Sequence, residues 1–171
     1  MKNVFLGTLA AVSLAACATP PLEMTAAPQA VQLRADAPMA RIRTDGQTPT
    51  TVRAFQAVTA ADGSVTRTEV AGATCSLTSD HFVANVVTPQ VVQLPKYDQD
   101  AELDNRGVPP SVVVNCTSGA LKGQGLIAAK PGQIVSGTGN LVADVFLIAG
   151  SAAIASAADW RYVPAVNVDL Q

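Results

Sequence analysis

The chain has 171 residues, a formal net charge of −2 and an apolar content of 49%. This length is sufficient for one domain with a buried core after a leader is removed. Its 11 basic residues form no cluster and aromatic residues make up only 4% of the chain, so we exclude a nucleic-acid binder and a carbohydrate platform of aromatic rings.

The first residues have the layout of an export signal. Lys2 precedes an apolar run that is too short to cross a bilayer, which needs about 20 apolar residues. The run ends in Leu14-Ala15-Ala16-Cys17, which resembles the lipobox of bacterial lipoproteins. The resemblance implies that a dedicated peptidase removes residues 1–16. It also implies that the cysteine carries a diacylglycerol thioether and usually an acylated amine. The alternative is an ordinary signal peptide with a cysteine beside it by chance.

A lipidated Cys17 predicts where the protein is held. Each buried acyl CH₂ contributes about 0.8 kcal/mol, so two or three chains hold a protein durably on a membrane. Ala18, not Asp, follows the cysteine. By resemblance to lipoproteins of Gram-negative bacteria, this implies export to the outer membrane. We therefore expect a cell-envelope protein that contacts the membrane through N-terminal acyl chains and faces the periplasm.

Cys75 and Cys116 are the two remaining cysteines. Disulfides form and persist in exported chains. The sequence has no Cys-x-x-Cys motif and only one histidine, so it supports neither a redox motif nor a zinc site. Compartment and parity therefore predict a Cys75–Cys116 disulfide, which would stabilise the fold by about 4 kcal/mol in the chain-entropy model.

Residues 17–50 are rich in Ala, Pro and Thr and show no sustained hydrophobic period. Such a composition predicts that the lipidated cysteine is followed by a flexible tether. A short strand is expected in its later part, between Val31 and Ile42. The folded domain is expected to span residues 51–171.

Short β-rich runs separated by turn residues begin at Thr51. Asp62-Gly63 predicts a hairpin turn, because glycine readily takes positive φ. Two apolar runs follow, with Pro89 between them and Pro95 ending the second. Residues 111–118 are the clearest strand because of their β-branched content.

The order of these runs resembles a known family between residues 70 and 121. The relevant stretches are Gly72-Ala73-x-Cys75-x-Leu77, Val86-Val87-Thr88-Pro89, Val91-Val92-Gln93-Leu94-Pro95 and Val112-Val113-Val114-x-Cys116. They resemble the PEGA-like β modules of bacterial surface proteins and lipoproteins, and a two-cysteine lipoprotein subgroup still more. The signature Pro-Glu-Gly-Ala is absent, and no aromatic residue follows Lys122-Gly123. The resemblance implies a compact β-sandwich and carries over no catalytic residue.

An acidic loop separates two of the runs. Asp98, Asp100, Glu102 and Asp104 alternate along it, and carboxylate oxygens are ligands that Ca²⁺ prefers. Leu103 stands where a calcium loop requires glycine, and no glutamate closes the loop. We interpret the loop as a solvated acidic segment and expect no metal and no cofactor.

His81 is the only histidine and follows Ser79-Asp80. Neighbours in sequence point in different directions on a strand or turn, so these three residues do not make a catalytic triad. We interpret them as polar turn residues and predict that the protein is not an enzyme and has no catalytic residue.

Residues 141–158 are apolar except for Asp144, Ser151 and Ser156. Three interpretations stay open: a helix docked on the domain or on the membrane surface, a membrane-inserted helix, and a self-association segment of small residues. Asp144 and the high alanine content weigh against a membrane span. We favour an apolar C-terminal helix near residues 140–158 that is docked rather than inserted.

The C-terminal residues Val166, Val168 and Leu170 alternate with polar ones and predict a terminal strand. Trp160 and Tyr162 precede this strand, either as interfacial aromatics or as core side chains. The two-cysteine lipoprotein group is similar here as well, with an apolar segment, an aromatic-Pro step and a valine strand.

Together these features predict a mainly β protein: a small PEGA-like β-sandwich with an apolar C-terminal helix and a terminal strand. We expect a membrane-anchored, non-catalytic cell-envelope lipoprotein that acts as a structural or protein-interaction module, with self-association as one form of partnership. The alternative is a lipoprotein that binds a small lipidic or peptide ligand or acts as an inhibitor. An exposed apolar cleft would favour this alternative.

Overall fold

The computed structural model describes residues 20–100, 106–131 and 159–171, and within these ranges nearly all regular structure is β. The strands of the N-terminal half are β1 (Gln29–Ala30), β2 (Gln32–Leu33), β3 (Ile42–Thr59), β4 (Val65–Val70), β5 (Thr74–Thr78), β6 (Phe82–Val87) and β7 (Gln90–Asp98). Those of the C-terminal half are β8 (Val112–Ser118), β9 (Leu121–Ile127), β10 (Ala129–Pro131), β11 (Asp159–Tyr162) and β12 (Ala165–Leu170). A 3₁₀ helix, η1 (Met39–Arg41), precedes β3.

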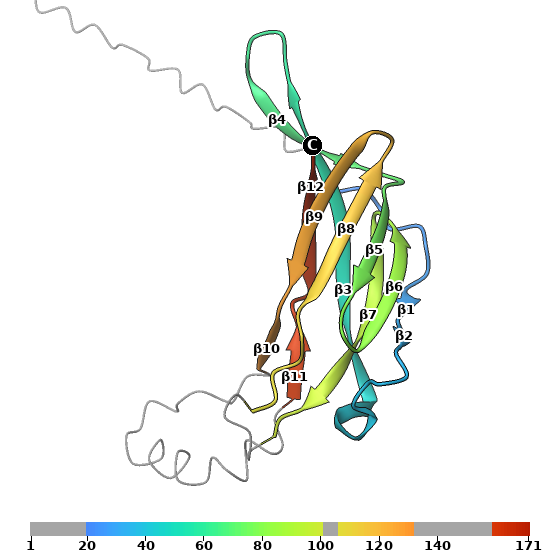
Figure 1. Cartoon of the computed structure of the whole chain (residues 1–171). Helices are drawn as coiled ribbons and strands as arrows, with labels where there is room; N and C mark the ends of the chain where they lie inside the picture. The colour runs from blue at the N-terminus through green and yellow to red at the C-terminus, as the bar shows by residue number, and fades with distance from the viewer. Residues whose placement is uncertain (1–19, 101–105, 132–158) are drawn as a thin grey trace, which may run out of the picture.

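The strands form two sheets that enclose one core (Figure 1). Sheet A has the order β10-β11-β7-β3-β12, with β1 beside β7 and β4 beside β3. Sheet B has the order β2-β6-β5-β8-β9. Alternate side chains of β5, β8 and β12 are buried, as expected for strands with one face against a core. The predicted mainly β, sandwich-like fold is confirmed, whereas the helix expected near residues 140–158 lies outside the described residues.

β3 is the longest strand and organises sheet A. It pairs antiparallel with β7 from Ile42 to Val52 and with β4 from Ala54 to Thr59. On this same strand, residues 51–56 pair in parallel with β12. The predicted terminal strand is therefore confirmed, and it adds to sheet A beside a strand that lies far earlier in the chain.

The two sheets are joined along both sides. Lys122 of β9 and Gln171 exchange two backbone hydrogen bonds of 3.0 and 2.9 Å, which ties sheet B to the end of β12. On the other side, β1 pairs with β7 of sheet A, and β2, one residue later, pairs with β6 of sheet B. The N-terminal segment therefore closes this side of the sandwich.

These pairings correct the expected boundary between tether and domain. β3 begins at Ile42 rather than near Thr51, and residues 29–33 already pair with both sheets. The short strand expected between Val31 and Ile42 is present as β2. Composition did not reveal the remaining pairing because β1 and β2 are two residues long and their side chains are exposed. Backbone hydrogen bonds, which any residue except proline can donate, hold them in place.

The turn residues are only partly where the sequence placed them. Gly63 has a φ of 82° in the turn between β3 and β4, so the predicted Asp62-Gly63 hairpin is confirmed. Pro89 separates β6 from β7 as expected, after a cis peptide bond with Thr88. Pro95 does not end its strand, because β7 continues to Asp98. Pro95 lies opposite Gln47, where the register between β3 and β7 shifts and a missing backbone donor is tolerated.

Candidate functional site

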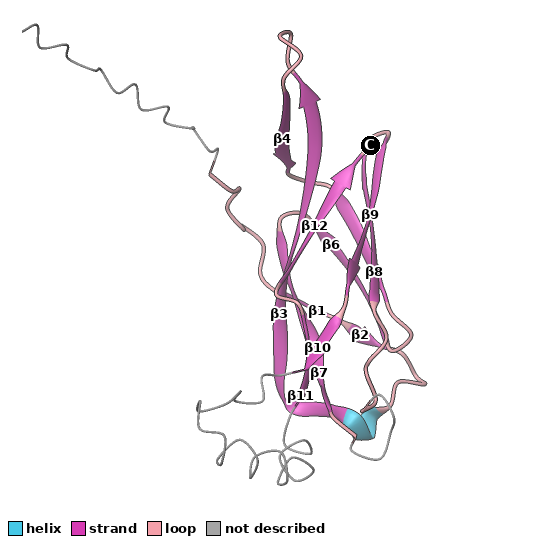
Figure 2. Cartoon of the chain, turned by 90° about the vertical axis from the view of Figure 1, so that its left-hand side faces the viewer, coloured by secondary structure: helices cyan, strands magenta, loops and turns pink. Residues whose placement is uncertain are grey.

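β3 and β4 continue past one end of the sandwich as a two-stranded hairpin, here called the hairpin arm and defined as residues 57–67 (Figure 1). The last pair between β12 and β3 is Leu170 with Gln56, so beyond this point β3 pairs only with β4 among the described residues. Every residue of the arm is exposed. The arm lies at the opposite end of the molecule from η1 (Figure 2).

The outer edge of the arm has unpaired backbone groups. Within the described ranges, β4 pairs with β3 and with no other strand. The Ala60 amide donates to the Ser64 carbonyl (2.8 Å), and antiparallel ladders alternate, so the backbone groups of Val65 and Arg67 point away from β3. Val58 and Val65 are 44% and 66% exposed. Edge strands of this kind are templates for pairing with another strand.

A cleft of about 600 Å³ lies between the arm and the end of the sandwich. Ala57, Val65, Leu121 and Leu170 give it apolar walls. Arg67 lies at its border, 3.9 Å above the Phe55 ring, and its Nε donates to Asp169 at 2.6 Å. The charge of Arg67 is therefore already paired at the surface, and the cleft presents mainly apolar contact area.

The N-terminal segment from residue 20 to residue 33, here called the strap, is attached at the base of the arm. The Leu22 amide donates to Glu69 Oε2 at 2.9 Å, and the Leu22 carbonyl accepts from Arg53 at 3.1 Å. Arg53 and Glu69 form an ion pair of 2.5 Å, and their side chains are only 17% and 9% exposed. The ion pair of Arg53 and Glu69, which is largely buried, thus binds both the amide and the carbonyl group of Leu22.

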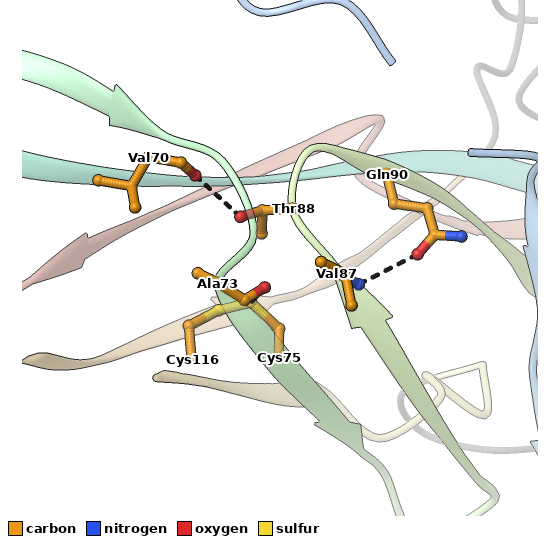
Figure 3. Close-up of a disulfide and its surroundings, with 7 residues drawn as sticks. All are labelled: Val70, Ala73, Cys75, Val87, Thr88, Gln90 and Cys116. Atoms are coloured by element: carbon orange, nitrogen blue, oxygen red, sulfur yellow. Dashed lines mark hydrogen bonds between the residues drawn. A yellow bond between two sulfur atoms is a disulfide. The ribbon is translucent and has the colours of Figure 1, made fainter. Parts of the chain in front are cut away.

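Further along, the strap is held between the two sheets. The Gln90 side chain donates to the Ala27 carbonyl at 3.0 Å. It also accepts from the Val87 amide at 3.1 Å (Figure 3). β1 and β2 then pair with β7 and β6. Sequence reasoning missed Arg53 and Glu69, since nothing in a strand pattern shows which backbone group a charged side chain will bind.

The predicted disulfide between Cys75 and Cys116 is confirmed (Figure 3). The two residues lie directly opposite each other on β5 and β8, with Cα atoms 4.0 Å apart, and both are buried. Beside them, Thr88 donates to the Val70 carbonyl at 3.0 Å and so ties the turn after β6 to the end of β4. This hydrogen bond links the end of β4, at the base of the arm, to the region of the disulfide.

The other end of the core is aromatic. Trp160 and Tyr162 are 8% and 3% exposed, so they are core side chains rather than surface aromatics. Tyr162 donates to the Pro110 carbonyl at 2.9 Å, and its ring packs edge-on against those of Phe82 and Tyr97. Burial raises the pKa of Tyr97 to about 12 and also raises the pKa of Tyr162. Both phenols are therefore neutral at pH 7 and act in packing and hydrogen bonding.

His81 lies at the edge of this aromatic cluster. Its Nδ1 is 3.2 Å from the Tyr97 hydroxyl, and burial lowers the pKa of His81. Ser79 is buried, whereas Asp80 is exposed. No hydrogen bond within the described residues joins the Ser79 hydroxyl to His81. The structure does not bring Ser79, Asp80 and His81 into a relay.

Only part of the acidic loop can be placed. Asp98 ends β7 and pairs with Arg43 at 3.2 Å, and the Asp100 amide donates to the Arg106 carbonyl at 3.1 Å. Glu102 and Asp104 lie outside the described residues. Across the ranges that the structure covers, no group of three or more His, Cys, Asp or Glu side chains is placed to hold a metal ion.

The lipobox residues Leu14, Ala15, Ala16 and Cys17 also lie outside the described residues. No helix in the described part of the chain is long and apolar enough to cross a membrane. Comparison with family models, with curated proteins and with solved structures gives no match. The PEGA-like resemblance and the lipobox therefore stay predictions from the sequence.

Proposed function

We propose that the protein is a non-catalytic lipoprotein of the bacterial cell envelope, anchored at the outer membrane through Cys17, and that it binds another protein through its hairpin arm. The observation that carries the proposal is the arm itself. It projects from a disulfide-linked sandwich with all its residues exposed and with an unpaired strand edge. A stable body that presents such an edge is suited to recognition.

The chemistry of the arm favours an extended peptide segment as the partner. A strand that adds to β4 would receive main-chain hydrogen bonds from the backbone groups of Val65 and Arg67. Val65, which is 66% exposed, would be covered at the same time. A strand from a second copy of the chain satisfies the same chemistry, so self-association is one form of the proposal.

A structural role for the reactive side chains supports the non-catalytic part. Tyr162 is held by the Pro110 carbonyl, and His81 lies against Tyr97. Arg43 is shared between Asp45 and Asp98, at 2.6 and 3.2 Å. Each of these groups has a partner that explains its position without a substrate.

A photo-crosslinking experiment in a Gram-negative host tests the arm. A benzophenone amino acid at Thr68, the β4 residue that directly follows the arm, is expected to give a protein adduct, whereas the same probe at the exposed Leu126 of β9 is not. In the Thr68 background, Val65→Pro removes an amide at the free edge and should abolish the adduct. Val65→Ala keeps the amide and should retain it. An adduct that survives Val65→Pro, or its absence at Thr68, would refute strand addition.

The cleft beside the arm supports a second candidate, the binding of a small lipidic or peptide ligand. Its volume of about 600 Å³ is in the range of small-molecule sites, and four of the residues that line it are apolar. Native mass spectrometry of the protein purified from membranes tests this function. The variant Ala57→Trp fills the cleft. A co-purified ligand that is lost in this variant would favour ligand binding in the cleft over protein binding by the arm.

A further inference from the structure

The attachment of the strap lies very close to the proposed lipid anchor. Leu22, which is held by Arg53 and Glu69, is five residues after Cys17. Even fully extended, five residues span at most about 18 Å. Cys17 and Leu22, which is held at the base of the arm, are therefore never farther apart than this length.

Several further contacts hold the strap to the sandwich and so keep the distance between Cys17 and the base of the arm short. Pro20 and Pro21 line a groove of about 160 Å³ together with Phe55 and Arg67. Behind Leu22, the strap is held by Gln90 and by the backbone pairs of β1 and β2. Lengthening the tether would require breaking the Leu22 contacts first and then the pairing of the strap with both sheets.

The two ends of the sandwich lie at different distances from the attachment of the strap. From Phe55, at the attachment, the arm extends about 20 Å to the turn at Asp62, at roughly 3.3 Å per residue. In the other direction, β3 runs about 40 Å from Phe55 to Ile42 by the same rise. The arm is therefore about as long as the tether, whereas η1 lies about twice as far from the attachment.

We propose that the strap orients the sandwich on the membrane, with the hairpin arm at the lipid surface and the η1 end pointing away from it. This inference rests on the lipid anchor at Cys17 proposed above. It adds that the partner of the arm is found at the membrane surface. The turn of the arm, residues 60–64, contains Asp62 and no basic residue, so the orientation follows from the tether and not from attraction to anionic lipids.

The test measures the distance of each end from lipid in the native protein. The full chain is produced with its own leader in a Gram-negative host, purified from membranes and reconstituted in phosphatidylcholine vesicles that contain a headgroup nitroxide lipid. A fluorescent amino acid replaces either Val65 on the arm or Met39 in η1. These positions are matched, since both are apolar and are 66% and 61% exposed. We expect stronger quenching at position 65 than at position 39.

A lengthened tether is the control that leaves the fold untouched. Twenty Gly and Ser residues inserted after Thr19 add about 25 Å of mean reach and should reduce the difference in quenching between the two positions. Equal quenching without the insertion, or stronger quenching at position 39, would overturn the orientation. Mass spectrometry of the same material reports the acyl groups on Cys17. Their absence would refute the anchor and the orientation together, whereas acylated protein with equal quenching refutes the orientation alone.

Discussion

At the scale of single residues, Gly123 shows how closely the two sheets approach each other. A Cβ at this position would lie 2.3 Å from the backbone oxygen of Asp169, which cannot move without shifting β12. A Cβ at Gly46 would instead meet the flexible end of Lys96 at 2.9 Å. Gly123 is therefore required for the contact between β9 and β12, whereas Gly46 is replaceable.

We expect Gly123→Ala to lower the free energy of unfolding by about 1–3 kcal/mol, as other overpacked sites do. Gly46→Ala should change it by less than about 0.5 kcal/mol, because the lysine end can move aside. Denaturant unfolding of both variants beside the wild type measures the difference. Equal stabilities of the two variants would show that β9 and β12 are not packed this closely in solution.

His81 gives the fold a dependence on pH. Burial lowers its pKa below the ordinary 6.5, so as the pH falls through 6.5 the unfolded chain binds a proton at this residue before the folded chain does. The free energy of unfolding should therefore decrease between pH 6.5 and the lower folded pKa. His81→Gln should remove this decrease. Denaturant titrations at pH 7.5, 6.5 and 5.5 test it, and an unchanged slope in the variant would exclude His81 as the cause.

Residue patterns predicted some of these positions and not others. The Asp62-Gly63 turn could be predicted because the positive φ that it requires is a local property. The position of Pro95 inside β7 could not, because it depends on a register shift in the neighbouring strand β3. The role of Glu69 depends on Leu22, which is 47 residues away in the chain. Local patterns carry no information on such pairs.

At the scale of elements, the disulfide joins β5, the central strand of sheet B, to its neighbour β8. β5 and β8 are separated by the β6–β7 region and the acidic loop, and the sequence separation of the two cysteines is 41. Cross-linking a loop of this length stabilises a fold by about 4 kcal/mol in the chain-entropy model. The pairing was predicted from the even number of remaining cysteines and from the expected export of the chain, whereas the strands that they join were not predicted.

We expect the double variant Cys75→Ala/Cys116→Ala to be less stable than the wild type by about 4 kcal/mol. A reductant should lower the stability of the wild type by a similar amount and leave the double variant unchanged. Thermal unfolding with and without reductant tests both statements. If thermal unfolding of the wild type were the same with and without reductant, the two cysteines would not be joined in solution.

The strap shows that elements without a hydrophobic pattern are predicted only in part: the short strand expected between Val31 and Ile42 corresponds to β2, whereas β1 was not expected. β1 and β2 have no buried side chain, so neither alternation nor a helical period marks them. β12 is the opposite case, since every second residue is buried and its pattern predicted a strand. Even there, the parallel pairing with β3 is a property of the whole fold.

At the scale of the whole molecule, the protein combines a closed body with one projecting part. Backbone bonds between Lys122 and Gln171 join the sheets on one side, and the strap joins them on the other. The arm carries an exposed edge of β4 outside this closed body. Natural proteins cover or shorten exposed edges unless an edge is used, which is why the arm is the candidate interaction surface.

The proposed lipid anchor at Cys17 leads to a prediction for the whole chain. If Cys17 is the anchor, a chain exported from Ala18 onward behind an ordinary cleavable signal should be released from membranes by carbonate washing. Within the described sandwich, Tyr97, Phe82 and Leu77 are among the largest fully buried side chains. The native chain, processed as expected, should stay with the membrane because its acyl chains remain buried in lipid. Retention of the shortened chain would mean that residues 141–158 act as a second anchor, and the proposed interaction module would then be a membrane-embedded one.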